Sequence, residues 1–172
     1  MGDIKILLVG CGYWGKNWYK TIKNSKYTLV GAVDPSPAID VDIPLFNDTK
    51  DVNIEYTHVI LAVNAKLQSQ MVNQLNIPQE NILVEKPCGV DIKDAKLIKD
   101  TFPGYIFLYS EEYQYIKNNL NKIGTPQYWK SIRASMGPKV RSDVSILEDY
   151  MIHDLYLYRD LLGHCKVYNK CW

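Results

Sequence analysis

The sequence lacks an excess of charge of either sign. Its 172 residues include 20 lysine and arginine residues and 19 aspartate and glutamate residues, so the formal net charge is +1. Proteins that bind nucleic acid concentrate positive charge on one face or along one helix. Here the basic residues are scattered among acidic ones, which favours a solvated surface and predicts no nucleic-acid partner.

Long apolar runs are also missing. A membrane-spanning helix needs about 20 consecutive apolar residues, and no stretch of this sequence approaches that length. The first residues, Met1 to Lys5, show neither the pattern of a secretory signal peptide nor that of a myristoylation site. We therefore expect a cytoplasmic protein that has no membrane partner.

Cysteine is scarce and has no recognisable spacing. The four cysteines do not form a disulfide framework in a chain of this length. Cys11 and Cys88 are expected to be small, partly buried thiols. His164 and Cys165 are neighbours, but the four ligands of a zinc site cannot be assembled around them locally, and so no metal site is predicted.

The most informative stretch is a glycine-rich loop near the start of the chain. The apolar run Ile6–Val9 lies in a first expected strand, Ile4–Val9. Gly10, Gly12 and Gly15 then form G-x-G-x-x-G, and a helix is expected over Tyr13–Lys23. In a dinucleotide-binding loop the first glycine permits a tight turn, the second lets backbone approach the pyrophosphate, and the third lets helix and strand pack closely. The helix start adds unpaired N–H groups and a positive dipole end.

Asp34 follows a second expected strand, Tyr27–Val33. A carboxylate about 20 residues beyond the glycines is placed to accept hydrogen bonds from the adenosine ribose hydroxyls. The alternative is an aspartate that forms a turn before Pro35. Because a carboxylate would repel a 2′-phosphate, the sequence favours NAD over NADP, although Ser36 or a nearby lysine could change this preference.

Strands and helices alternate as far as Tyr109, which predicts an α/β fold with a Rossmann-type doubly wound parallel sheet. We expect a dinucleotide-binding domain over residues 1–118 and a truncated α+β C-terminal portion over residues 119–172. The further expected strands are Pro44–Phe46, Thr57–Val63, Asn81–Glu85, Tyr105–Tyr109, Tyr128–Met136 and Cys165–Trp172. The further expected helices are Ala65–Leu75, Ile92–Asp100 with Asp91 as its cap, Glu111–Lys122, and Ser145–Leu162, which ends at Gly163.

Two places carry titratable groups suited to catalysis. Lys86 follows Glu85 at the carboxyl end of a strand, where ligands bind in open α/β sheets; the alternative is a lysine that simply extends into water. Asp149 and His153 are four residues apart on an expected helix, so their Cβ atoms lie about 5–6 Å apart. The carboxylate could orient the imidazole and raise its pKa, or the two could form a surface ion pair worth at most about 0.5 kcal/mol.

Four motifs together resemble the glucose-fructose oxidoreductase/inositol dehydrogenase (Gfo/Idh/MocA) family. They are Val9-Gly-Cys-Gly-Tyr-Trp-Gly-Lys-Asn17, Val30-Gly-Ala-Val-Asp-Pro35, Ile82-Leu-Val-Glu-Lys-Pro87 and Leu147-Glu-Asp-Tyr-Met-Ile-His153. The resemblance implies an NAD(P)-dependent dehydrogenase that acts on a small sugar or cyclitol. The glycine loop is similar to that of members that oxidise nucleotide sugars at C3.

The resemblance also implies roles for individual residues. Lys86, Asp149 and His153 match the family's catalytic group. His153 would take the proton of a substrate hydroxyl, and Lys86 would stabilise the developing negative charge. Asp149 would orient His153 or bind a neighbouring hydroxyl. The peptide bond before Pro87 is often cis in the family. The expected cofactor contacts are Gly10, Gly12, Tyr13, Trp14, Gly15, Asp34, Val63, Asn64, Gln68, Glu85 and Lys86, with packing as the alternative role of Trp14.

The sequence departs from the family pattern in three places. Val63 and Asn64 stand where Thr-Pro is common, and Gln68 stands near the place of a histidine. Tyr156 stands near the place of a second aspartate. Most of the C-terminal sheet that forms the wall of the substrate pocket is missing, which would leave an exposed sheet edge. We therefore expect a homodimer or, as the alternative, a rearrangement of Tyr128–Met136 and Cys165–Trp172 that covers the edge. The alternative function is a catalytically impaired dinucleotide-binding or regulatory module.

Overall fold

The computed structural model describes residues 3–38, 40–134 and 143–163. The chain divides into two compact units, Met1–Gly104 and Tyr105–Trp172. This division falls before the helix expected at Glu111–Lys122, whereas the sequence predicted a boundary after residue 118. The assignment of separate functions to the two parts stays a prediction, and each unit is described by itself.

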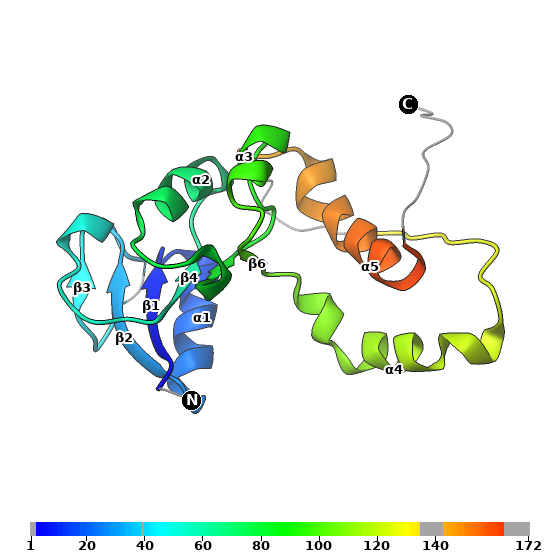
Figure 1. Ribbon diagram of the computed structural model, residues 1–172, viewed down its shortest axis with the longest axis horizontal. Helices are drawn as coiled ribbons and strands as arrows, with labels where there is room; N and C mark the ends of the chain where they lie inside the picture. The colour runs from blue at the N-terminus through cyan, green and yellow to red at the C-terminus, as the bar shows by residue number, and fades with distance from the viewer. Residues whose placement is uncertain (1–2, 39, 135–142, 164–172) are drawn as a thin grey trace. The chain divides into compact units, whose positions relative to one another are not determined.

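The first unit is built on a parallel sheet. Its described residues form six strands in the order β3-β2-β1-β4-β5-β6, and every neighbouring pair is parallel. The chain winds outward in one direction from β1 and then in the other from β4 (Figure 1), which is the arrangement of a doubly wound sheet. The expected Rossmann-type α/β fold is therefore confirmed. The strands are β1 (Lys5–Val9), β2 (Thr28–Val33), β3 (Leu45–Phe46), β4 (His58–Leu61), β5 (Ile82–Val84) and β6 (Phe102–Pro103).

Helices cover both faces of this sheet, because successive residues of a strand point to opposite sides. Leu7 belongs to the same buried cluster as Val72 of α2. Its neighbour Leu8 belongs to a second cluster with Ile22 of α1. Burial on both sides explains why these strands are continuous apolar runs. The helices of the first unit are α1 (Tyr13–Lys23), α2 (Ala65–Gln74) and α3 (Ile92–Leu97), the last capped by Asp91 as expected.

Two of the three loop glycines are required by packing. Gly10 has a φ of 94°, and a Cβ atom built on it would lie 2.6 Å from the carbonyl oxygen of Ala62. A Cβ atom built on Gly15 would lie 2.0 Å from the carbonyl oxygen of Gly10. A Cβ atom on Gly12 would meet nothing within 4 Å. The fold therefore excludes side chains at Gly10 and Gly15, whereas the space at Gly12 is open.

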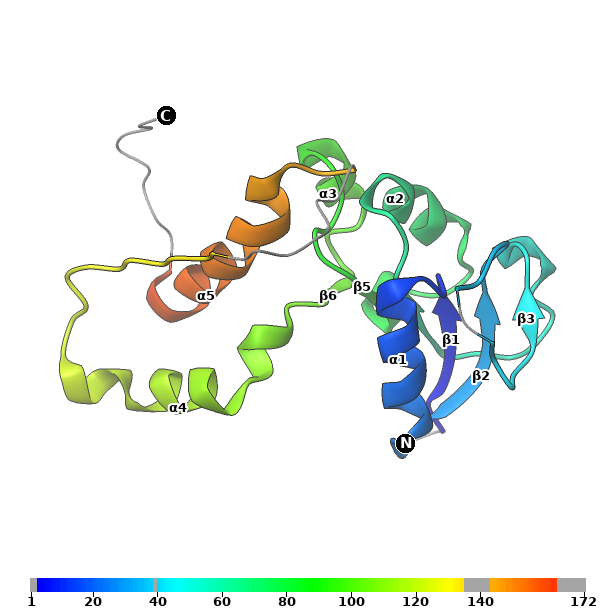
Figure 2. The same cartoon turned by 180° about the vertical axis from the view of Figure 1, so that it is seen from behind.

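The described part of the second unit consists mainly of helices, α4 (Glu111–Asn119) and α5 (Ile152–Leu162), the latter preceded by a π-helix, Leu147–Met151. Figure 2 shows α4 in green and α5 in orange to red. The two expected helices are confirmed over most of their length, and Gly163 ends α5 with a φ of 79°.

Two expected strands are wrong. Residues expected as the strand Tyr105–Tyr109 form a short 3₁₀ helix, Ile106–Tyr109, since a short apolar run does not separate strand from helix. Residues 128–134 of the expected strand Tyr128–Met136 have no regular structure. This segment is attached to α5 by side chains rather than by a strand ladder, because Ser131 and Arg133 both donate to Asp154. Residues 135–136 and the expected strand Cys165–Trp172 lie outside the described residues.

The described stretches lack two kinds of feature, a membrane-spanning helix and a metal-binding cluster. None of the helices there combines the length and the apolar composition that a membrane crossing requires. The same stretches contain no group of three or more histidine, cysteine, aspartate or glutamate residues arranged to hold a metal ion.

The glycine geometry yields a paired stability prediction. Gly15→Ala places a methyl group against backbone that cannot move away as a flexible side chain would, so it should lower the free energy of unfolding by about 3 kcal/mol. Gly12→Ala, in open space, should change it by less than about 1 kcal/mol. Denaturant unfolding of the two variants checks this, and equal stability of the two would contradict the packing argument.

Candidate active site

The loops that carry the expected cofactor contacts meet at one edge of the first unit. Parallel strands have their carboxyl ends on the same side, and ligands of open α/β sheets bind there. Backbone hydrogen bonds tie the start of each loop to the neighbouring strand. These bonds run from Gly10 N to Val33 O (2.8 Å), from Ala62 N to Val9 O (2.7 Å) and from Glu85 N to Leu61 O (3.0 Å).

The start of α1 fits the pyrophosphate of a dinucleotide. Lys16 N makes the first backbone bond of the helix, to Gly12 O at 2.9 Å, so the N–H groups before it have no partner within the helix. The first turn carries no acidic side chain that would repel an anion. Tyr13 and Trp14 flank this end with their rings edge to face, 5.8 Å apart, and both side chains are exposed.

The Asp34 carboxylate accepts hydrogen bonds from the glycine loop and from the turn that follows Asp34. One carboxylate oxygen accepts the N–H of Cys11 at 2.6 Å, and the other accepts the N–H of Ser36 at 2.8 Å. An ionised carboxylate can accept about four hydrogen bonds, so both interactions leave capacity for ribose hydroxyls. The contact with Cys11 had no signal in the sequence. The ribose contact stays a prediction.

Cys11 is a buried thiol, as expected. Its side chain is fully buried, and burial together with the charge of Asp34 raises the pKa of the thiol to about 11. The thiol is therefore neutral near pH 7 and is a poor nucleophile. It contributes packing beside the loop rather than reactivity.

Glu85 and Lys86 leave the carboxyl end of β5 together. Glu85 is buried, and its Oε1 accepts the indole N–H of Trp18 at 2.6 Å. Lys86 is half-buried, and the bond between Lys86 and Pro87 is cis. Trp18 was expected only as an apolar residue of α1. Its spacing on the helix predicts packing, whereas its hydrogen bond depends on a partner 67 residues away.

The three expected contacts after β4 have different surroundings. Val63 lies at the glycine loop, since a Cβ atom on Gly10 would be 3.0 Å from its Cγ1. The Asn64 side chain accepts the N–H of Lys66 at 3.0 Å and caps α2. Gln68 is fully buried, and its amide bonds the backbone of the turn after β5. Direct contacts of these residues with a cofactor stay predictions.

Asp149 and His153 belong to the second unit. Asp149 lies in the π-helix and His153 in α5. His153 is buried, with its Nδ1 3.1 Å from the Tyr156 hydroxyl and its ring 4.9 Å from that of Phe107. The Tyr156 ring in turn stacks on Tyr105 at 4.2 Å. The hydrogen bond at Nδ1 fixes the orientation of the imidazole ring. The catalytic role of His153 stays a prediction.

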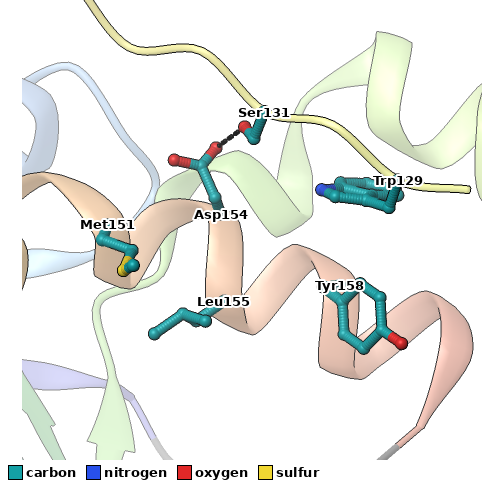
Figure 3. Close-up of a pocket in the computed structure, with 6 residues that line it drawn as sticks. All are labelled: Trp129, Ser131, Met151, Asp154, Leu155 and Tyr158. Atoms are coloured by element: carbon teal, nitrogen blue, oxygen red, sulfur yellow. Dashed lines mark hydrogen bonds between the residues drawn. The ribbon is translucent and has the colours of Figure 1, made fainter. Parts of the chain in front are cut away.

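A shallow cavity of about 250 Å³ lies on the other face of α5 (Figure 3). Both carboxylate oxygens of its one acidic lining residue, Asp154, are engaged, by Ser131 at 2.6 Å and Arg133 at 2.7 Å. With 3.6 residues per turn, the helical residues that line it face away from His153. The cavity is therefore not part of the histidine site. Its lining residues are Trp129, Ser131, Met151, Asp154, Leu155 and Tyr158.

The sheet order, the glycine loop and the open helix N-terminus together define a Rossmann-type dinucleotide-binding protein. The profile of an oxidoreductase family with an NAD-binding Rossmann fold, Gfo/Idh/MocA, matches residues 4–105, and the chain belongs to this family. The resemblance seen in the motifs is thus confirmed. The cofactor of the family is NAD, and the described residues of the first unit fit it.

Solved structures share the fold. A protein of Magnetospirillum magnetotacticum MS-1, provisionally classed as an oxidoreductase, superposes with a TM-score of 0.75 at 22% identity over 95% of this chain and 58% of its own. The WlbA (WbpB) dehydrogenase of Thermus thermophilus, solved with NAD and α-ketoglutarate, gives 0.68 at 15% identity over 93% and 63%. The scyllo-inositol dehydrogenase of Lactobacillus casei, solved with NAD(H) and scyllo-inositol, gives 0.60 at 20% over 70% and 42%.

The chain therefore spans between 42% and 63% of the length of these three structures. At such identities the similarity establishes the fold alone. A comparison with curated protein sequences found no match.

Asp34 provides a test of cofactor preference. Asp34→Asn keeps the size of the side chain and removes its charge. It should weaken NADH binding by about tenfold or more, which is the contribution of a hydrogen bond to a charged group. The preference for NADH over NADPH should become smaller. Calorimetric titration with both dinucleotides measures this, with Asp100→Asn as an exposed control. Unchanged NADH affinity would show that Asp34 stabilises its own turn and does not bind the cofactor.

Asp154 provides a pH test of the second unit. Burial alone would raise the pKa of this carboxyl, but hydrogen bonds from Arg133 and Ser131 outweigh it and hold the pKa below its usual value. The ionised group therefore stabilises the fold fully above the unfolded pKa of about 3.9, and this stabilisation is lost as the pH falls through the lowered folded value. Asp154→Asn should flatten the pH dependence of unfolding below about pH 4, and an unchanged dependence would contradict this account.

Proposed function

We propose that this protein is an NAD-dependent oxidoreductase that transfers hydride between nicotinamide and a carbinol carbon of a sugar, cyclitol or nucleotide sugar. The observation that carries the proposal is the place of Lys86. It leaves the sheet at the carboxyl edge, beside Glu85, whose carboxylate is bonded to the helix that follows the glycine loop. A lysine held at that edge is suited to meet a ligand of the loop rather than to pack in a core.

The proposed chemistry assigns one task to each residue. NAD, when bound, supplies the acceptor for the hydride. His153 takes the proton of the reacting hydroxyl, with its Nδ1 held by Tyr156. Lys86 donates a hydrogen bond to the same oxygen and stabilises its developing negative charge. Asp149, four residues before His153, orients the imidazole or binds a neighbouring hydroxyl.

The substrate class is taken from the relatives. One structure of the family fold holds scyllo-inositol and another holds UDP-GlcNAcA, each with the nicotinamide cofactor. Both compounds present vicinal hydroxyl groups, which suit a site with one proton acceptor and one cationic donor. The homodimer expected from the sequence stays a prediction.

Turnover tests the proposal. The protein is incubated with NAD and a panel of cyclitols, sugars and nucleotide sugars, and NADH is followed by its absorbance. Lys86→Met and His153→Asn should each lower kcat/KM by about 100-fold or more. NADH affinity should change little in His153→Asn, because His153 is not among the expected cofactor contacts. Lys93→Met removes an exposed lysine as a control.

The outcomes separate the candidate functions. Turnover that depends on both residues supports the dehydrogenase. NADH binding without turnover on any panel member would instead support the alternative derived from the sequence, a dinucleotide-binding or regulatory module.

A further inference from the structure

Gln68 occupies an unusual place for a polar side chain. It lies on α2, and its side chain has no solvent exposure. Its Nε2 donates to the carbonyl oxygen of Glu85 at 2.7 Å, and its Oε1 accepts the N–H of Gly89 at 2.7 Å. The Gln68 amide therefore makes one hydrogen bond at each end of the Glu85–Gly89 turn, which contains Lys86.

The partners determine which way the amide points. A backbone carbonyl only accepts and a backbone N–H only donates, so the NH₂ group must face Glu85 and the oxygen must face Gly89. Both contacts are buried. Loss of the side chain would remove a buried hydrogen bond from each end of the turn, and a buried polar group that loses its partner costs about 1–3 kcal/mol.

A second link holds the same turn from another helix. The buried carboxylate of Glu85 accepts the indole N–H of Trp18 on α1. The residue before Lys86 is therefore fixed through its backbone by α2 and through its side chain by α1. Lys86 has little freedom to change its direction relative to the glycine loop.

We propose that Gln68 is a positioning residue for Lys86, acting through the backbone of the Glu85–Gly89 turn, and not a direct contact of the cofactor. This inference rests on the proposed function in one respect, the catalytic role of Lys86. It replaces the direct cofactor contact that the sequence suggested for Gln68. The described contacts of the amide are to protein backbone, and its complete burial separates it from a ligand at the sheet edge.

The test compares variants that differ in what the side chain can donate and accept. Gln68→Leu removes both bonds, Gln68→Glu keeps the acceptor and loses the donor, and Gln68→His retains one donor and one acceptor on its neutral ring. Gln70→Leu is the matched control, since Gln70 is an exposed glutamine on the same helix. Each variant is first compared with the unmutated protein by thermal unfolding.

Three measurements then follow. Hydrogen exchange reports the protection of the Gly89 amide. The ¹³C resonance of reductively methylated Lys86, assigned by its absence in Lys86→Arg, reports the surroundings of the lysine without any need for turnover. Calorimetry and steady-state kinetics report NADH affinity, KM and kcat.

We expect Gln68→Leu to speed exchange at Gly89, to shift the Lys86 resonance, and to lower kcat by about 100-fold, the effect of misplacing a catalytic group by about 1 Å. NADH affinity should stay the same, and Gln68→His should restore kcat in part. If Gln68→Leu does not fold, Gln68→Glu gives the same comparison with a smaller change in shape.

Two results would overturn the inference. One is weaker NADH binding by Gln68→Leu with kcat and the Lys86 resonance unchanged, which would make Gln68 a cofactor contact. The other is a Lys86 resonance that is identical in the unmutated protein, Gln68→Leu and Gln70→Leu. A lack of turnover in the unmutated protein would count against the proposed function only, because the Lys86 resonance and the Gly89 exchange still decide the role of Gln68.

Discussion

The close approach of α1 to the end of β1 is the constraint on which the rest of the first unit depends. The position of a Cβ atom on Gly15 is 2.0 Å from the carbonyl oxygen of Gly10, so helix and strand can pack this tightly only with glycine at both places. The approach places the helix N-terminus at the carboxyl edge of the sheet, where its free N–H groups and dipole favour an anion. Packing does not require glycine at position 12, so the open space beside Gly12 is available to the ligand.

A set of buried polar contacts then holds the other loops around this point. Asp34 reaches the backbone of Cys11, Trp18 reaches Glu85, and Gln68 reaches both ends of the turn that contains Lys86. Each contact joins residues that are far apart in the chain and leaves few alternatives, because a buried donor or acceptor without a partner is costly. The edge is therefore organised before any ligand binds, which is the condition for accurate positioning of reacting groups.

The two faces of α5 in the second unit have different surroundings. One face of α5 carries His153 and Tyr156, packed with aromatic rings. The opposite face carries Leu155, which lies exposed beside the cavity together with Met151 of the preceding π-helix. The family match covers residues 4–105 and does not reach this helix, so the catalytic role of His153 stays a prediction from the sequence motif.

The sequence by itself determined the order of strands and helices as far as α3, the glycine loop and the acidic residue after β2, because these depend on local periodicity and on backbone conformations that only glycine adopts readily. It failed at residues 128–134, where alternation predicts a strand but Asp154 holds the segment by its side chain. It also gave no sign that Trp18 bonds Glu85 or that Gln68 holds a turn, since hydrophobic periodicity does not say which distant group will meet a buried donor. Only the tertiary structure decides these pairings, because a buried polar group takes its partner from whatever the fold brings within about 3 Å.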